Sequence, residues 1–147
     1  MAELSDPVHD EIKRLCAAGD GHAERQAYSD ALASYWAAWD LLPEPKTGWE
    51  PATWILVAIG DANYLDGDSV AGRDNLSIAM HCPGAIGNPF IRFRLGQCQF
   101  EVGDHERAAD ELMRAYVGAG REILDQHDRS IVGSCRVDPK RCDDLDT

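Results

Sequence analysis

The side chains best suited to nucleophilic or metal chemistry, five histidines and five cysteines, are scattered along this 147-residue chain. A Cys–His pair must lie within hydrogen-bonding distance, and a zinc site needs ligands at short, regular spacings. His81 and Cys82 are adjacent, but neighbouring side chains on a helix point apart. The chain contains no His-Glu-x-x-His, Gly-x-Ser-x-Gly, phosphate-loop or dinucleotide-binding motif. We therefore expect no enzyme activity, no bound metal and no cofactor.

The cysteines also bear on the cellular compartment, because their number is odd and they form no Cys-x-x-Cys pair. They are Cys16, Cys82, Cys98, Cys135 and Cys142. The N-terminal region carries charges throughout and contains no apolar run long enough for a signal peptide. The longest apolar stretch, residues 54–59, is far shorter than the ~20 residues that cross a bilayer. We expect free thiols in a cytoplasmic protein that does not enter a membrane.

Acidic side chains dominate the charge of the chain, whose formal net charge is −12. Residues 1–45 hold nine acidic side chains and three basic ones, so the surplus is concentrated in the first half. Such a surface repels a phosphate backbone, which argues against a nucleic-acid ligand and favours a basic protein as partner. The alternative is that the charge only keeps the protein soluble.

The strongest pattern in the chain is an internal repeat with an offset of 36 residues. Residues 59–68 (Ile-Gly-Asp-Ala-Asn-Tyr-Leu-Asp-Gly-Asp) align without gaps with residues 95–104 (Leu-Gly-Gln-Cys-Gln-Phe-Glu-Val-Gly-Asp). A looser copy, which contains Ala18-Gly19, lies 41 residues before the second copy. Repeats of this length are supersecondary units that must stack to bury their apolar faces, and about three are needed for stability. Three copies are present here.

Apolar and small residues recur in each copy at three- and four-residue steps, which predicts pairs of amphipathic helices. Gly-Asp between the helices predicts that Gly ends one helix and that Asp caps the next, although the first copy has Gln26-Ala27 instead. We expect glycines to let the paired helices approach closely. The side chains expected to fill the space between them are Tyr64, Leu76, Phe100 and Leu112. We place helices at residues 7–25, 28–42, 50–66, 69–81, 89–102 and 105–124.

These residues resemble the tetratricopeptide repeat, with a large apolar residue before Gly, an aromatic residue four positions on, and Gly-Asp at a turn. The resemblance implies an all-α fold, a right-handed α-solenoid of about three helical hairpins, with repeats at about 12–43, 53–84 and 89–120. The helical repeat domain then spans residues 1–125, and we expect residues 126–147 to form a polar, mobile tail. The alternative is an unrelated helical bundle with accidental self-similarity.

In tetratricopeptide-like arrays the first helices of the hairpins line a concave groove that binds a partner. The resemblance, carried over position by position, implies that the second hairpin contributes Trp54, Val57, Asp61 and Tyr64. The third hairpin contributes Phe90, Phe93, Arg94, Gln97 and Phe100. The first hairpin contributes Lys13, Cys16, Asp20 and Glu24. Aromatic and arginine side chains dominate binding energy at protein interfaces. The alternative is that the aromatic side chains belong to the core.

The chain also resembles small bacterial repeat proteins encoded near secreted polymorphic toxins, through Gly-Asn-Pro-Phe at 87–90 and Gly-Ala-Gly at 118–120. This resemblance implies a cytoplasmic immunity protein that binds and neutralises a cognate toxin. Two alternatives stay open. The first is a generic adaptor or chaperone-like peptide-binding protein, including a secretion chaperone. The second is a self-associating structural unit whose last hairpin docks onto a second copy.

Overall fold

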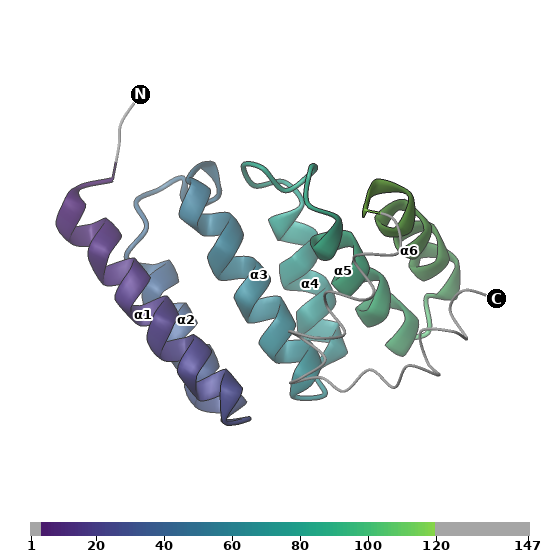
Figure 1. Cartoon of the computed structure of the whole chain (residues 1–147), viewed down its shortest axis with the longest axis horizontal. Helices are drawn as coiled ribbons and strands as arrows, with labels where there is room; N and C mark the ends of the chain where they lie inside the picture. Colours follow the sequence, from purple (N-terminus) through teal and green to yellow (C-terminus); the bar gives the residue numbers. More distant parts are fainter. Residues whose placement is uncertain (1–3, 120–147) are drawn as a thin grey trace.

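Residues 4–119 are described by the computed structural model and form six α-helices and one short 3₁₀ turn (Figure 1). The helices are α1 (Asp6–Glu24), α2 (Tyr28–Asp40), α3 (Glu50–Leu65), α4 (Ser69–Ala79), α5 (Pro89–Glu101) and α6 (His105–Ala119), with the 3₁₀ turn η1 (Lys46–Gly48) before α3. The prediction of an all-α fold is confirmed for this range. The first five helices match their predicted bounds to within two residues at each end.

The sixth helix begins at residue 105 as predicted, while the predicted continuation to residue 124 lies outside the described residues. The predicted polar tail at 126–147 lies outside them as well. None of the helices between residues 4 and 119 is both long enough and apolar enough to cross a membrane.

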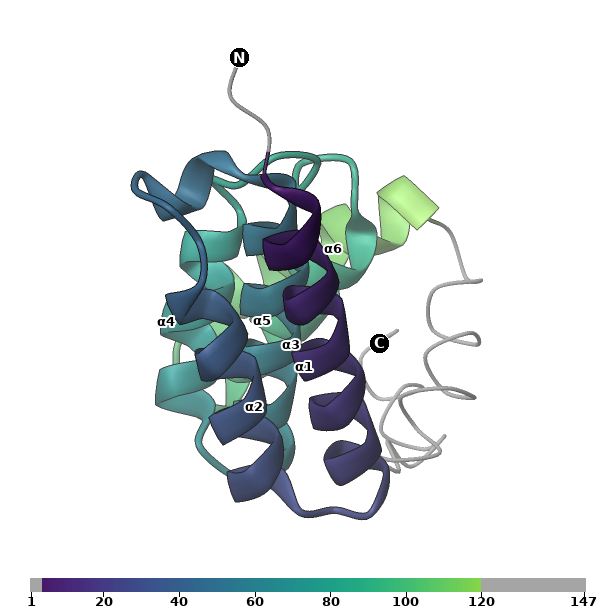
Figure 2. The ribbon, with the colours of Figure 1, turned by 90° about the vertical axis from the view of Figure 1, so that its left-hand side faces the viewer.

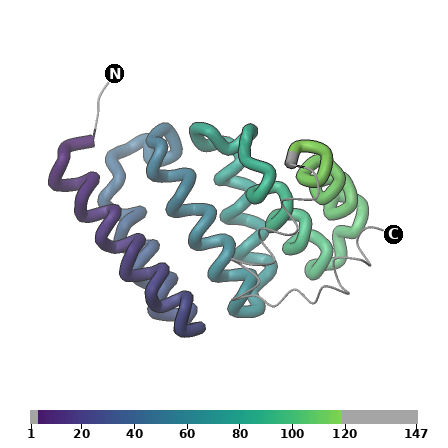
Figure 3. The backbone as a smooth tube through the Cα atoms, viewed as in Figure 1, coloured from purple at the N-terminus to yellow at the C-terminus, as the bar shows by residue number. Residues whose placement is uncertain are grey.

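Helices that are consecutive in the chain pair as hairpins, α1 with α2, α3 with α4 and α5 with α6. Because α2 also contacts α3 and α4 contacts α5, the three hairpins lie in a row that follows the sequence (Figures 1 and 3). Figure 2 looks along this row from the α1 end, with α2 and α4 to one side of α1 and α3. The first helices also touch one another, since α3 contacts both α1 and α5.

Each hairpin contains a glycine of the first helix against a large side chain of the second. The three pairs are Gly19–Tyr35, Gly60–Leu76 and Gly96–Leu112, which occupy equivalent positions in the repeat. A Cβ added at Gly60 would lie 2.5 Å from Cγ of Leu76, and one at Gly96 would lie 2.8 Å from Cγ of Leu112. No methyl group fits at such distances without movement. The prediction that glycines allow close helix approach is therefore confirmed, and it accounts for glycine inside a helix.

The turns of the second and third hairpins use the predicted Gly-Asp pair. Gly67 and Gly103 have φ angles of +86° and +93°, a left-handed conformation that glycine adopts without steric cost. The carboxylate of Asp68 accepts a hydrogen bond from the backbone N–H of Ala71 at 3.1 Å, which caps α4. Asp104 accepts one from the backbone three residues on at 3.4 Å. The predicted turn is thus confirmed in both copies.

The turn of the first hairpin has the same form with less suitable residues. Gln26 occupies the left-handed position with a φ of +61°, and Ala27 at the N-cap of α2 has no side-chain acceptor. A non-glycine residue at positive φ is disfavoured by contact between its Cβ and the backbone. The first repeat therefore keeps the geometry of the other two at a cost in stability.

The core runs from α1 to α5 and contains the fully buried side chains Ile12, Ile55, Ile59, Leu76 and Ile91. A smaller cluster of Phe93 and Ala115 joins α5 to α6. The prediction that Tyr64 and Phe100 fill the space between paired helices is wrong for Phe100, whereas Tyr64 packs against the core cluster as a partly buried side chain. Tyr64 is half-buried, while Phe100 is 42% exposed and stacks on His105 with ring centroids 4.6 Å apart. Phe100 lies near the end of α5, beside the turn to α6.

Candidate functional site

The predicted partner-binding residues lie on α1, α3 and α5, and we call the surface that they mark the first-helix face. Asp20, Asp61 and Gln97 occupy equivalent positions of the three hairpins, at offsets of 41 and 36 residues. Since α3 contacts both α1 and α5, these positions form a row across neighbouring helices. Residues from three separate repeats are thereby brought to one side of the protein.

Exposure differs widely among the predicted residues. The exposed ones are Lys13, Asp20, Glu24, Trp54 and Phe100. The half-buried ones are Cys16, Val57, Asp61, Tyr64 and Phe90. The buried ones are Phe93, Arg94 and Gln97. The accessible part of the first-helix face therefore consists of the first two groups, and their contact with a partner stays a prediction. The buried group has a structural task, which its contacts show.

An ion pair joins the second hairpin to the third. Nε of Arg94 lies 2.7 Å from Oδ1 of Asp61, and Nη1 of Arg94 donates a hydrogen bond to Oε1 of Gln97 at 2.6 Å. The guanidinium also lies over the rings of Tyr64 and Phe90, 4.7 and 5.6 Å from their centroids. Arg94 is 0% exposed, and a buried charge persists only when it is paired and hydrogen-bonded. Arg94 thus fastens α5 to α3.

The unpaired negative charge of the first-helix face lies on α1, because the Asp61 carboxylate of α3 is paired with Arg94. Burial raises the pKa of the Asp61 carboxyl, the charge of Arg94 acts in the opposite direction, and Asp20 adds to the increase. Tyr35 donates a hydrogen bond from its hydroxyl to Oδ1 of Asp20 at 2.6 Å. Burial, together with that carboxylate, raises the pKa of Tyr35, which keeps the hydroxyl protonated as a donor. Asp20 is therefore held in place and stays exposed.

The thiols near this face are poorly suited to nucleophilic chemistry. Cys16, Cys82 and Cys98 are free, which confirms the prediction of free thiols for these three, while Cys135 and Cys142 lie outside the described residues. Burial, with a contribution from Asp20, raises the pKa of Cys16 to about 11, and burial raises that of Cys98 to about 12. Both therefore stay protonated at neutral pH, and the thiolate is the reactive form.

The arrangement of the accessible residues is that of a binding surface. Trp54 and Phe100 are large, exposed aromatic side chains, and the ring of Trp54 meets that of His9 edge-on at 5.9 Å. Asp20 and Glu24 add exposed carboxylates on α1. Aromatic rings and carboxylates both attract lysine and arginine side chains, through cation–π contacts and ion pairs. The first-helix face can therefore hold a basic segment of another protein.

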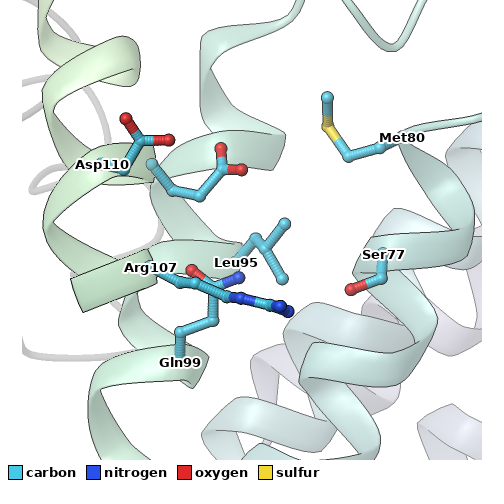
Figure 4. Close-up of a pocket in the computed structure, with 7 residues that line it drawn as sticks. Ser77, Met80, Leu95, Gln99, Arg107 and Asp110 are labelled. Atoms are coloured by element: carbon cyan, nitrogen blue, oxygen red, sulfur yellow. The ribbon is translucent and has the colours of Figure 1, made fainter. Parts of the chain in front are cut away.

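A second polar cluster, missed from the sequence, lies between α4, α5 and α6 (Figure 4). It surrounds a pocket of about 380 Å³, which we call the outer pocket, lined by Ser77, Met80, Leu95, Gln99, Arg107, Asp110 and Glu111. The signal that could have found it is the alignment of Asn63 with Gln99, which places a polar amide at one inward position of both repeats.

Comparison of this sequence with protein-family models gave no match, and comparison with curated protein sequences gave none either. The resemblance to the tetratricopeptide repeat therefore rests on the residues of the sequence.

Proposed function

We propose that this chain is a protein-binding module, a right-handed α-solenoid of three tetratricopeptide-like hairpins that binds a basic protein through its first-helix face. The observation that carries the proposal is the row of equivalent positions on α1, α3 and α5. Two of its three members, Asp20 and Asp61, are carboxylates, and aromatic side chains flank the row on α3 and α5. Repeat proteins present such aligned positions to extended surfaces of their partners.

The biological role that we propose is that of a cytoplasmic immunity protein, which covers and neutralises a cognate bacterial toxin. The net charge of −12 supports a basic partner, because complementary charge accelerates the encounter of two proteins and disfavours acidic competitors. Asp20 and Glu24 are exposed on the side of the face that carries no exposed aromatic residue, so electrostatics and apolar contacts are supplied by different hairpins. Such a division suits an interface in which charge guides docking and aromatic residues hold the complex.

The test is to express the product of the adjacent gene with and without this chain. The proposal predicts that the product is toxic, that the chain restores growth, and that the two proteins form a 1:1 complex whose association rate falls as salt is added. An adjacent product that is neither toxic nor bound contradicts the immunity role. Equal affinity for an isolated basic peptide and for the intact partner assigns the chain to the adaptor or chaperone class instead.

Self-association is a second candidate, favoured by the surface of α6. Met113, Tyr116 and Val117 are 62%, 42% and 75% exposed and follow one another at steps of three and one residues, which places them on one side of the helix. Exposed apolar stripes of this kind often mark an interface. Light scattering at increasing concentration decides the point, since a rise in mass supports self-association and a constant monomer mass removes it.

A further inference from the structure

The contact between α3 and α5 holds a buried guanidinium together with all its partners. Arg94 of α5 forms an ion pair with Asp61 of α3 at 2.7 Å and donates to Gln97 of its own helix at 2.6 Å. The rings of Tyr64 and Phe90 lie 4.7 and 5.6 Å from the guanidinium. Each of these residues has an equivalent one repeat earlier, so the same positions can be compared at the neighbouring contact, between α1 and α3 (Figure 1).

At the contact between α1 and α3, the position of the arginine is occupied by an alanine. Ala58 precedes Arg94 by the 36 residues of the repeat and is half-buried. A methyl group cannot reach the neighbouring first helix as the arginine side chain does at the next contact. The helix α3 also contains no lysine, arginine or histidine. The second hairpin therefore extends no cation from its first helix toward α1, whereas the third hairpin extends one toward α3.

Most of the partners that a guanidinium would need at this place are nevertheless present. The equivalent residues are Asp20 for Asp61, Trp54 for Phe90, Asp61 for Gln97 and Ala23 for Tyr64. Two carboxylates and one aromatic ring thus correspond to the partners of the buried arginine, and only the second ring is lost. We call the surface of Asp20, Trp54, Ala58 and Asp61 the α1–α3 site.

Asp20 is an exposed carboxylate that is held in place without a cation. Tyr35 donates its hydroxyl to Oδ1 of Asp20 at 2.6 Å, and among residues 4–119 no basic side chain forms an ion pair with Asp20. Burial raises the pKa of Asp61, Arg94 acts in the opposite direction, and the charge of Asp20 raises that pKa further. One arginine therefore serves two neighbouring carboxylates, and a second cation beside Asp20 would balance the charge.

Trp54 supplies the aromatic surface of the α1–α3 site. It lies one helical turn before Ala58 and on the same side of α3, as Phe90 does relative to Arg94 on α5. Its side chain is 38% exposed, and its ring meets that of His9 edge-on at 5.9 Å. Tryptophan is the best aromatic partner for a cation, and arginine is the cation found most often in such contacts. A guanidinium can also bind a carboxylate through two parallel hydrogen bonds, which lysine cannot do.

We propose that the α1–α3 site binds an arginine side chain of the partner protein, whose guanidinium takes the place that Arg94 occupies at the next contact. The guanidinium pairs with Asp20, donates to Asp61 and lies against the ring of Trp54. The inference rests on the proposed function, because it names the side chain that the first-helix face selects from a basic partner. The row of first helices then has a guanidinium at both of its contacts, one from the partner and one from the chain itself.

The test uses the peptide N-acetyl-Gly-Arg-Gly-amide as probe. Its control carries citrulline in place of arginine, because citrulline keeps the planar shape and loses the charge. Binding to the full chain is followed by ¹H–¹⁵N NMR through the indole N–H of Trp54 and the backbone amides of Asp20 and Ala58. We expect saturable shifts of these signals with the arginine peptide, and at least about fivefold weaker binding of the citrulline peptide.

Two variants act on the site in different ways. Asp20→Asn removes the charge but keeps an oxygen that accepts from Tyr35, so the protein should fold and bind the arginine peptide at least about fivefold more weakly. Ala58→Arg supplies the guanidinium from the chain itself and should abolish binding of the peptide. The control is Asp40→Asn, which removes an exposed carboxylate at the end of α2 and should change the affinity by less than about twofold.

The proposal is overturned if the arginine peptide does not bind, if the citrulline peptide binds equally well, or if Asp20→Asn leaves the affinity unchanged. Binding of the adjacent gene's product tests the proposed function separately. If that product binds the unmodified chain and the Asp20→Asn and Ala58→Arg variants with equal affinity, the proposed function stands and the arginine site is wrong. If the peptide binds at the α1–α3 site while the product is not bound, the arginine site stands and the proposed function is wrong.

Discussion

The second and third hairpins have the same backbone structure but differ in the helices that surround them. In both, a glycine of the first helix meets a leucine of the second, and Gly-Asp makes the turn. The second hairpin has neighbours on both sides, and its Leu76 is 0% exposed. The third has a described neighbour only toward α4, and its Leu112 is half-buried. The repeat therefore determines the hairpin, while position in the row determines how tightly its side chains are enclosed.

The polar residues extend this comparison. In the second hairpin, the side-chain amides of Asn63 and Asn75 form a hydrogen bond with each other, and Asp61 forms an ion pair with the third hairpin. The third hairpin receives that carboxylate with Arg94 but leaves Gln99 beside a pocket. The amides of the second hairpin thus satisfy each other, whereas the buried carbonyl of Gln99 in the third has no hydrogen-bond partner among the described residues.

The largest effect is expected from removing the contact that joins the two hairpins. Asp61→Ala leaves the buried Arg94 without its carboxylate and should lower the free energy of unfolding by about 3 kcal/mol, measured by urea denaturation. Asp66→Ala, which removes an exposed carboxylate at the end of the same helix, should cost less than about 0.5 kcal/mol. In a double-mutant cycle with Arg94→Ala, a coupling energy near zero would show that the two hairpins are not linked through this pair.

Substitution of the paired glycines measures how enclosed each hairpin is. Gly60→Ala forces a methyl group against the buried Leu76 and should cost about 2 kcal/mol after the gain in helix propensity. Gly96→Ala should lower the free energy of unfolding by about 1 kcal/mol, which is half as much, because the half-buried Leu112 side chain can move toward solvent. Thermal unfolding of both variants provides the comparison. A larger cost at Gly96 would contradict the difference in enclosure that we describe.

The buried amides of the two hairpins should respond in opposite directions. Asn63→Leu breaks the bond to Asn75 and is expected to lower stability by about 1 kcal/mol. Gln99→Leu removes an amide whose carbonyl has no described partner, so stability should stay the same or rise by up to ~1 kcal/mol. Chemical denaturation of the two variants under the same conditions is the measurement. Equal losses would mean that Gln99 is as well satisfied as Asn63.

The smallest effect concerns the first hairpin, which departs from the other two at its turn. Gln26→Gly relieves a side chain at a φ of +61° and should raise stability by about 0.5–1 kcal/mol. Ala27→Asp supplies the missing cap of α2 and should add a similar amount, about 0.5–1 kcal/mol. Thermal unfolding of the single and double variants checks both. A fall in melting temperature for Gln26→Gly would show that the left-handed conformation is not strained.

Helix positions could be predicted from the sequence because local signals define them. Gly67 and Gly103 end helices through their backbone freedom, and the 36-residue repeat fixes the pairing of neighbours. Exposure could not be predicted in the same way, because it depends on which helix lies next to a side chain. Phe100 was assigned to the space between helices and is exposed, whereas Arg94 was assigned to a binding surface and is buried. The outer pocket could not be predicted from the sequence either, because it forms only where three helices meet.

The central claim is that a basic protein binds the first-helix face, and charge reversal at its edge tests it most directly. Glu24 and Asp40 are both exposed and lie in the last turns of α1 and α2, where a lysine is favoured by the helix dipole, so both reversals should leave the fold intact. The measurement is the dissociation constant of the complex with the adjacent gene's product. We predict that Glu24→Lys weakens binding at least about tenfold, through lost attraction and new repulsion, while Asp40→Lys changes it less than about twofold. Equal effects of the two reversals would contradict the account.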